Sequence, residues 1–226
     1  MSKSLAVIIH ARTQSTRVPN KHLRDLGDGK TIIDLSLELL SNLKNVEEKY
    51  LAVHEDELKE RVVDGVEILH REYEAVAPGN ASHDIMYKHL ENVKSDYIVN
   101  LNPCQPFLQV DKLQDVINWF KIVQSDSAIT VKKTRNFYWD RMLKPLNFLP
   151  SDRLSTTSGP FVYEATHSLV FYKKEYMLTE WQLFSNTQKD PETYVVDWSE
   201  EELLDVDTEL DFEIVKNYYQ KTNRLK

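Results

Sequence analysis

The sequence is poor in cysteine and glycine, and each scarcity excludes a class of protein. Cys104 is the one cysteine among 226 residues, so the chain cannot form an internal disulfide. Disulfide scaffolds belong to oxidising compartments, and we therefore expect a cytoplasmic protein. The five glycines form neither the Gly-x-x-x-x-Gly-Lys-Ser/Thr spacing of a P-loop nor the Gly-x-Gly-x-x-Gly spacing of a dinucleotide-binding turn. Nucleotide binding through either motif is excluded.

Long apolar runs and a basic excess are also missing. No run approaches the roughly 18 apolar residues of a membrane span, and a strand-like segment begins within five residues of the N-terminus, so we expect no membrane partner and no signal peptide. With 36 acidic and 28 basic residues, the net charge is −8. Nucleic-acid-binding proteins usually carry a basic excess or stripe, so we expect no nucleic-acid partner. The length suits one large α/β domain with an appendage, or two small domains.

A cationic loop follows the first apolar run, residues 5–10. This run, Leu-Ala-Val-Ile-Ile-His, is typical of a strand buried in a parallel sheet. The next residues include Arg12, Arg17 and Lys21 but no carboxylate before Asp25, and a helix is expected after them. A strand, a cationic loop and a helix in this order can hold a polyphosphate at the carboxyl end of the strand. A solvated basic loop is the alternative.

Strand and helix patterns alternate along most of the chain. Such alternation predicts βαβ units and hence an α/β fold, with a parallel or mixed sheet covered by helices on both faces. The expected strands are 5–10, 49–54, 66–70, 97–101, 127–132, 169–172 and 193–198. The expected helices are 31–43, 55–63, 83–93, 111–123 and 209–221.

The alternation breaks over residues 134–164. This segment is rich in aromatic residues and prolines but has no clear period. It is too long for an ordinary connection, and such segments are usually functional or form an interface. Disordered segments are poor in aromatics, so the composition favours a subunit contact or a lid.

Asp205 and Asp207 are separated by one residue just before the last expected helix. In an extended segment, residues two apart project from the same face, and two such carboxylates can hold Mg²⁺ together with phosphate oxygens. The alternative is that one aspartate caps the helix and the other is solvated. Thr208 can also serve as the cap, which would leave both aspartates free.

Arg71 and Ser82 are expected near the same edge of the sheet as the cationic loop. Arg71 follows the third expected strand directly, and Ser82 precedes the helix expected at 83–93. Ligands of parallel sheets bind at the carboxyl ends of the strands, so these residues can share a crevice with Arg12 and Lys21. Taken singly, each is more often an ordinary surface group.

Two separated motifs resemble those of the sugar-acid cytidylyltransferases. Residues 11–23, Ala-Arg-Thr-Gln-Ser-Thr-Arg-Val-Pro-Asn-Lys-His-Leu, are similar to the family pattern Ala-Arg-x-x-Ser-x-Arg-(Leu/Ile)-Pro-x-Lys-x-Leu. Residues 205–211, Asp-Val-Asp-Thr-Glu-Leu-Asp, are similar to Asp-Ile-Asp-Thr-Glu-Leu-Asp. Between them, residues 70–71 and 80–82 fall where the family places base and ribose contacts. The family includes CMP-sialic acid synthetases and, more distantly, CMP-Kdo synthetases, and the resemblance covers nearly the whole chain.

The resemblance implies a Rossmann-like nucleotidyltransferase fold forming one domain over residues 1–226. The implied enzyme joins CTP to a sugar acid, sialic-acid-like or another nonulosonate, and releases pyrophosphate. Members are dimers that exchange an insertion arm, which matches residues 134–164 and implies a homodimer. Carried over to this sequence, the triphosphate contacts are Arg12, Ser15 and Lys21, of which Arg12 and Lys21 are also catalytic. The cytidine contacts are Arg71 and Ser82, and the ligands of the Mg²⁺ cofactor are Asp205 and Asp207.

The acceptor side departs from the family pattern. The run Gln-Pro-Thr-Ser-Pro-Leu-Arg appears as residues 102–108, in which Asn102 replaces glutamine and the arginine is absent. Cys104 stands where the Kdo branch has a metal-binding aspartate. The family's Asn-Gly-Ala-Ile-Tyr appears as His-Ser-Leu-Val-Phe at 167–171, and His22 replaces the usual asparagine after the lysine. The acceptor-side residues expected from this comparison are Asn102, Gln105 and His167.

Three other functions fit parts of the pattern. A glycosyltransferase can use an Asp-x-Asp motif, although that motif normally follows a central strand in the middle of the chain. A divergent, non-catalytic homologue would bind the nucleotide without turnover. A cytidylyltransferase for a different acidic acceptor would explain why the nucleotide side is retained better than the acceptor side.

Overall fold

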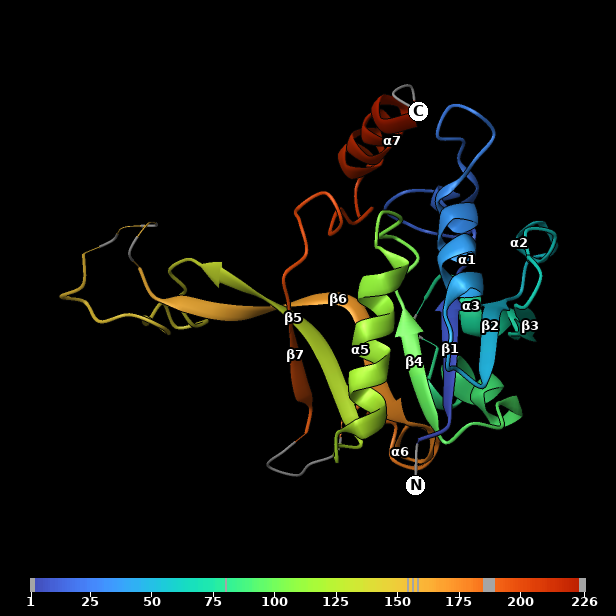
Figure 1. Ribbon diagram of the computed structural model, residues 1–226, viewed down its shortest axis with the longest axis horizontal. Coiled ribbons are helices and arrows are strands. Elements are labelled where there is room, and N and C mark those ends of the chain that lie inside the picture. The colour runs from blue at the N-terminus through green and yellow to red at the C-terminus, as the bar shows by residue number, and fades with distance from the viewer. Residues whose placement is uncertain are drawn as a thin grey trace.

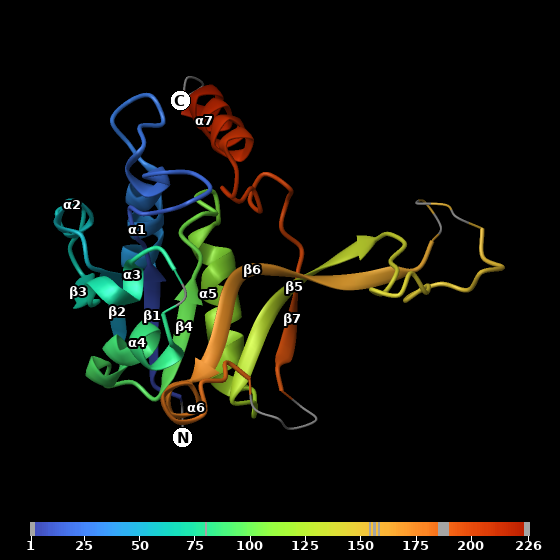
Figure 2. The ribbon, with the colours of Figure 1, turned by 180° about the vertical axis from the view of Figure 1, so that it is seen from behind.

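The computed structural model describes residues 3–79, 81–153, 155, 157, 159–184 and 190–223. Asn80, within the segment that the family resemblance associates with the base and ribose, lies outside these residues. In the described part of the chain, no helix is long and apolar enough to cross a membrane. A sheet of seven strands with helices on both faces forms the body, which confirms the expected α/β class (Figures 1 and 2).

The sheet is mixed and mostly parallel. Its strands follow the order β3-β2-β1-β4-β6-β5-β7, and β6 is antiparallel to both of its neighbours. The other pairs, β1 with β2 and β4, β2 with β3, and β5 with β7, are parallel. The strands are β1 (Leu5–His10), β2 (Glu48–Val53), β3 (Glu67–His70), β4 (Tyr97–Leu101), β5 (Ser127–Arg135), β6 (Phe161–Lys173) and β7 (Glu192–Val196).

Helices connect most of these strands. Thr31 begins α1 with a capping box, in which its side chain and that of Asp34 each accept a hydrogen bond from the other residue's backbone N–H. The α-helices are α1 (Ile32–Asn42), α2 (Asp56–Lys59), α3 (Tyr73–Val76), α4 (His83–Tyr87), α5 (Val110–Ile122), α6 (Lys174–Thr179) and α7 (Glu209–Asn223). Two 3₁₀ helices are η1 (Lys21–Leu23) and η2 (Lys88–Asn92).

The central strand β1 is buried on both faces, as its apolar sequence predicts. Alternate residues point to opposite faces of a strand. Leu5, Val7 and Ile9 therefore pack with α1 and α5, whereas Ala6 and Ile8 pack with η2, α6 and β6. Figure 1 shows α1 and α5 on the near face of the sheet, and Figure 2 shows α3, α4 and α6 on the other. This burial fixes β1 and therefore the start of the loop at residue 11.

Several loops meet at the carboxyl ends of the parallel strands. The loops after β1, β3 and β4 leave the sheet at this edge, and the segment that precedes α7 returns to it (Figure 1). The inner face of α7 packs Phe212, Val215 and Tyr219 against Val18 and Cys104. Packing of this helix therefore brings the chain before it, residues 205–208, to the loops that follow β1 and β4.

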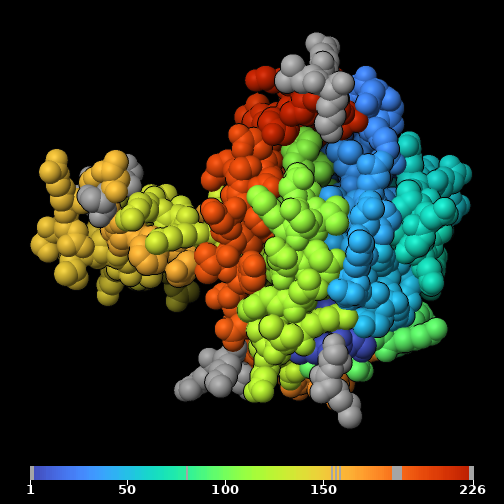
Figure 3. Space-filling view, in the orientation of Figure 1, coloured from blue at the N-terminus to red at the C-terminus, as the bar shows by residue number. Residues whose placement is uncertain are grey.

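Residues 134–164 include a long arm that projects from the body. β5 and β6 pair as an antiparallel hairpin out to Arg135 and Phe161, and the connection between them lies far from the sheet (Figures 1 and 3). The arm exposes large apolar side chains, namely Trp139, Met142, Leu143, Leu146, Leu149, Phe161 and Tyr163.

Some predicted elements differ in extent. The helix expected at 55–63 is only the single turn α2, in which Leu58 is the one buried residue. The helix expected at 83–93 divides into α4 and η2. The strand expected at 169–172 is only the inner end of β6. The outer half of β6 is more exposed and pairs with β5 along the arm.

Candidate active site

Lys21 joins the cationic loop to the segment that carries the two aspartates. Its side chain is buried, and Nζ donates a hydrogen bond of 2.6 Å to the carbonyl oxygen of Val206. The same ammonium group interacts with the thiol of Cys104, whose pKa burial raises. The structure therefore brings Lys21, Asp205 and Asp207 together, although the two motifs are far apart in sequence.

Two side-chain amides from the turn after β4 hold Asp205. Asn102 Nδ2 donates to Asp205 Oδ2 at 3.0 Å, and Gln105 Nε2 reaches the same oxygen at 3.4 Å. Burial raises the pKa of Asp205, and the charge of Asp207 raises it further. A nearby cation would stabilise these carboxylates. Asn102 and Gln105, expected on the acceptor side, thus contact the expected metal ligand itself.

The final helix uses Thr208 as its cap and leaves both aspartate side chains free of that role. Thr208 Oγ1 accepts a hydrogen bond from the Asp211 N–H at 3.2 Å, and Asp211 Oδ2 accepts one from the Thr208 N–H at 2.7 Å. Asp207 Oδ1 instead forms an exposed ion pair of 2.8 Å with Arg17 Nη2. Such exposed pairs contribute little to stability, so Asp207 can exchange this partner at low cost.

Arg12 and Arg71 are two cations that lie close enough to affect each other. Arg12 Nη1 donates to the carbonyl of Val76 at 3.3 Å, and Arg71 Nη2 donates to that of Ala75 at 2.9 Å. Within the described residues, neither side chain forms an ion pair, and Nε of the buried Arg71 has no hydrogen-bond partner. Burial lowers the pKa of Arg71 and the charge of Arg12 lowers it further, whereas the carboxylate of Glu55 acts in the opposite direction. Two neighbouring cations that form no ion pair within the described residues favour an anionic ligand at the sheet edge.

The two predicted serines occupy different settings. Ser15 lies in the cationic loop, where its Oγ accepts a hydrogen bond from the Val18 N–H at 3.3 Å. Ser82 is exposed at the start of α4, and its side chain makes no capping hydrogen bond to the helix backbone. It interacts with the carboxylate of Asp84 instead. Within the described residues, no hydrogen bond joins Ser82 to Arg71.

A pocket of about 280 Å³ lies between Arg71 and Asn102. His167 lines it from a bulge in β6 and has a left-handed backbone, with φ of 55°. Non-glycine residues rarely adopt this conformation, and its occurrence often marks a functional site. His10 and Tyr87 also line the pocket, and sequence reasoning missed both.

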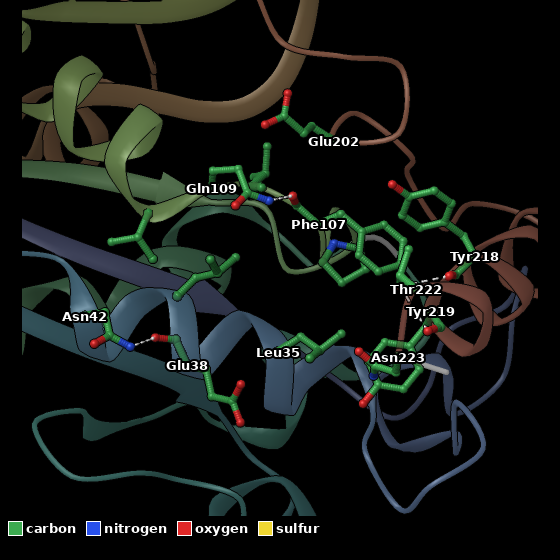
Figure 4. A pocket seen from close by; sticks show the side chains of 14 residues that line it. Leu35, Glu38, Asn42, Phe107, Gln109, Glu202, Tyr218, Tyr219, Thr222 and Asn223 are labelled. Carbon is green, nitrogen blue, oxygen red and sulfur yellow. Dashed lines mark hydrogen bonds between the residues drawn. The ribbon is translucent and has the colours of Figure 1, made fainter. Parts of the chain in front are cut away.

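A larger hollow of about 500 Å³ lies apart from these residues, between α1, the chain after Pro106 and α7. Figure 4 shows Phe107 and Tyr218 at its wall, with Glu38 and Asn42 across from them. No residue expected in the active site lines it.

Comparison with known proteins identifies the family to which this chain belongs. The model of the cytidylyltransferase family matches residues 6–224. The chain belongs to this family. Two curated cytidylyltransferases for 3-deoxy-manno-octulosonate are similar over part of their length. That of Flavobacterium johnsoniae is 28% identical over 119 residues, and that of Christiangramia forsetii is 25% identical over 118. Each match covers 52% of this chain and 46% of the relative, so this cytidylyltransferase aligns with about half the length of those proteins.

Solved structures support the same fold. CMP:2-keto-3-deoxy-manno-octonic acid synthetase in complex with CTP superposes with a TM-score of 0.69 at 16% identity, over 97% of this cytidylyltransferase and 99% of that chain. 4-Diphosphocytidyl-2C-methyl-D-erythritol synthase from Anaerococcus prevotii gives 0.63 at 14% identity, over 96% of both chains. At these identities the likeness establishes the Rossmann-like nucleotidyltransferase fold.

Proposed function

We propose that this cytidylyltransferase transfers CMP from CTP to a sugar acid of the nonulosonate or octulosonate type and releases pyrophosphate. One observation carries the proposal. Arg12 and Arg71, two neighbouring cations, lie at the sheet edge where Lys21 joins the cationic loop to the segment containing Asp205 and Asp207. A nucleoside triphosphate is an anion large enough to contact both groups.

The reaction needs positioning and charge rather than a covalent nucleophile. A hydroxyl oxygen of the acceptor attacks the α-phosphorus, a new P–O bond forms, and the bond to the bridging oxygen of pyrophosphate breaks. The acceptor hydroxyl loses its proton to solvent, and the pyrophosphate leaves with the bonding electron pair. Arg12, Ser15 and Lys21 hold the triphosphate. Of these, Arg12 and Lys21 stabilise the negative charge that develops on the pyrophosphate leaving group.

Asp205 and Asp207 are the residues that would hold Mg²⁺. The fit rests on two carboxylates two residues apart, one with a raised pKa and the other in an exposed ion pair that is easily replaced. The described residues contain no group of three or more side chains that could hold a metal ion by themselves. Mg²⁺ commonly completes its shell with water and phosphate oxygens, and it would supply charge neutralisation at the phosphates here.

The arm is proposed as the dimer contact. Residues 134–164 expose a series of large apolar side chains far from the core, and such surfaces mark interaction sites. A second copy of this chain is the proposed occupant, as the family resemblance implies. We also expect the protein to act in the cytoplasm, in line with its single buried cysteine.

Pyrophosphate release in the presence of CTP, Mg²⁺ and a panel of sugar acids tests the function. Release that requires one of the acceptors supports the transferase. CTP binding without turnover across the panel would favour the non-catalytic alternative. Pyrophosphate release only with an acid that is not a sugar would favour a different acidic acceptor. The altered turn at 102–108 is the reason to test such acids.

A further inference from the structure

Glu55 is a carboxylate attached to the cationic loop, residues 11–21. It lies between β2 and α2, and its Oε1 accepts two hydrogen bonds of 2.9 Å from Thr13, one from the backbone N–H and one from the side-chain hydroxyl. Its other oxygen, Oε2, is buried and has no hydrogen-bond partner within the described residues. A negative side chain bonded to a loop that is expected to bind phosphate needs a reason other than affinity for anions.

Helix α2 does not explain the choice of glutamate. Glu55 occupies the N-cap position, where serine, threonine, aspartate and asparagine are preferred. Its carbonyl oxygen accepts hydrogen bonds of 3.2 Å from the N–H groups of Leu58 and Lys59, but its side chain makes no capping hydrogen bond. Leu58 is fully buried and anchors this turn in the core. The body of the protein therefore fixes the backbone of Glu55, and its side chain holds the loop instead of the helix.

Thr13 controls the shape of the loop. Its carbonyl oxygen accepts hydrogen bonds from the N–H of Ser15 at 2.9 Å and from the N–H of Asn20 at 3.1 Å. Asn20 has a left-handed backbone, with φ of 53°, and η1 begins at the next residue, Lys21. Thr13 thus lies next to Arg12 and bonds the backbone of Ser15. It also closes the loop immediately before Lys21, so its position sets the spacing of the three residues proposed to hold the triphosphate.

The charge of Glu55 also opposes the repulsion between neighbouring cations. Burial acts to raise the pKa of Glu55, but hydrogen bonds, chiefly from the Thr13 N–H, outweigh this effect and hold the pKa below its usual value. The carboxylate is therefore charged at neutral pH. Burial and the charge of Arg12 lower the pKa of Arg71, and Glu55 acts in the opposite direction. Before an anion binds, the carboxylate thus offsets part of the repulsion between the two guanidinium groups.

We propose that Glu55 is the positioning residue of the triphosphate loop. Through its two hydrogen bonds to Thr13, it holds the three proposed phosphate contacts at the spacing that binds the β- and γ-phosphates of CTP. It does not touch the nucleotide itself. The inference rests on the proposed use of CTP and adds to it a residue that the sequence motifs do not include. Without the carboxylate, the Thr13 N–H and hydroxyl lose their partner, and the loop can leave the arrangement that binds phosphate.

The test measures the affinities for CTP and for CMP by titration calorimetry, with Mg²⁺ and without acceptor. CMP lacks the two phosphates that the loop is proposed to hold, so it reports whether the rest of the site is intact. Glu55→Ala removes both hydrogen bonds, whereas Glu55→Gln keeps an oxygen that can accept them. Glu57→Ala is the matched control, because Glu57 is an exposed carboxylate in the same helical turn. Thermal unfolding verifies that each variant is folded.

We expect the wild-type protein and the Glu57 control to bind CTP with the same affinity, and to bind it more tightly than CMP. Glu55→Ala should weaken CTP binding by roughly ten-fold or more, the loss expected for hydrogen bonds to a charged group. Its affinity for CMP should change by less than about three-fold, because the loop contributes little to CMP binding. Glu55→Gln should weaken CTP binding by only about three-fold, because it keeps the contact with Thr13.

Thr13→Val separates the route through Thr13 from any other effect of Glu55. It keeps the branched shape of the side chain and removes the hydroxyl that donates to Glu55. We expect it to weaken CTP binding about three-fold in the wild-type background. In the Glu55→Ala background it should have no further effect, because residues in contact give non-additive changes. If Glu55→Ala does not fold, unchanged CTP affinity in Thr13→Val would overturn the proposal.

Unchanged CTP affinity in folded Glu55→Ala would overturn the proposal as well. Equal weakening of CTP and CMP binding would also contradict it, since Glu55 would then support the site as a whole rather than the triphosphate loop. Equal losses in Glu55→Gln and Glu55→Ala would refute the hydrogen-bonded route through Thr13. Wild-type protein that binds neither nucleotide would refute the proposed function, whereas each of the other results leaves CTP binding by the wild-type protein in place.

Discussion

Lys21 and Val206 are joined by a 2.6 Å hydrogen bond, although 185 residues separate them. The ammonium group lies between the cationic loop and a carbonyl flanked on each side by an aspartate. One buried cation therefore connects the loop proposed to hold phosphate to the segment proposed to hold the metal. This connection makes Lys21 and the two aspartates the first residues to test.

Lys21→Ala should lower kcat/KM for CTP-dependent pyrophosphate release by about 10²- to 10³-fold, as expected when one preorganised charge is removed. The variant loses both the charge and the tether to Val206. Lys30→Ala is the control, because Lys30 pairs with Glu38 on the exposed side of α1. A folded Lys21→Ala enzyme with full turnover would refute the assigned role.

Asp205→Asn should abolish the Mg²⁺ dependence together with most of the activity, by about 10²-fold or more. Asparagine keeps the shape and can still accept from Asn102, so the fold should persist. Asp115→Asn, on the exposed face of α5, is the control. Activity is measured against Mg²⁺ concentration and in excess chelator. Wild-type turnover that is the same with chelator as with Mg²⁺ would rule out the metal role.

His22 should make the protein sensitive to acid. Burial, with Lys21 and Arg12, lowers its pKa from 6.5 to about 3. Between these values the unfolded chain binds a proton that the folded chain does not, so the free energy of unfolding falls as pH drops below about 6.5.

His22→Asn removes this difference and restores the residue usual in the family. Between pH 7 and pH 5, we expect the variant to lose about 2 kcal/mol less stability than wild type, measured by urea denaturation at both pH values. His70→Asn, at an exposed site, should follow wild type. An identical loss in the His22 variant and in wild type would contradict the prediction.

Charged substitutions in the arm should dissociate the proposed dimer. Leu143 is 82% exposed and Leu146 is 64% exposed. Glutamate at both positions would place charges in an apolar contact, so we expect the mass in solution to fall from dimer to monomer with little change in the unfolding temperature. Ile122→Glu is the matched control, since Ile122 is 80% exposed on α5, outside the arm. Light scattering measures the mass, and monomeric wild-type protein would refute the contact.

The sheet and the loops at its edge could be predicted because their signals are local. The apolar run of β1, the helix pattern at 31–43 and the Asp-x-Asp segment before α7 each lie within a short stretch. Their order also places Arg12, Arg71 and Asp205 at one edge once the strands are parallel. The capping role of Thr208 was left open in the sequence, and the structure decides it through the contact with Asp211.

The pocket could not be predicted, because it depends on contacts between distant residues. His10 meets His89 across 79 residues through the packing of η2 under the sheet. The bulge that contains His167 lies opposite Thr130, whose Oγ1 is 2.7 Å from that of Thr166. The outer half of β6 was missed for a similar reason, since exposed hairpin strands lack the apolar pattern of buried ones.

Transfer of label from CTP tests the central claim most directly. The protein is incubated with Mg²⁺, the active sugar acid and CTP labelled with ³²P at either the α- or the γ-phosphate. The account predicts that α-label moves to a product containing the acceptor, whereas γ-label appears in pyrophosphate, in equal amounts and only when the acceptor is present. Label released as free CMP, or γ-label found on the acceptor, would contradict it.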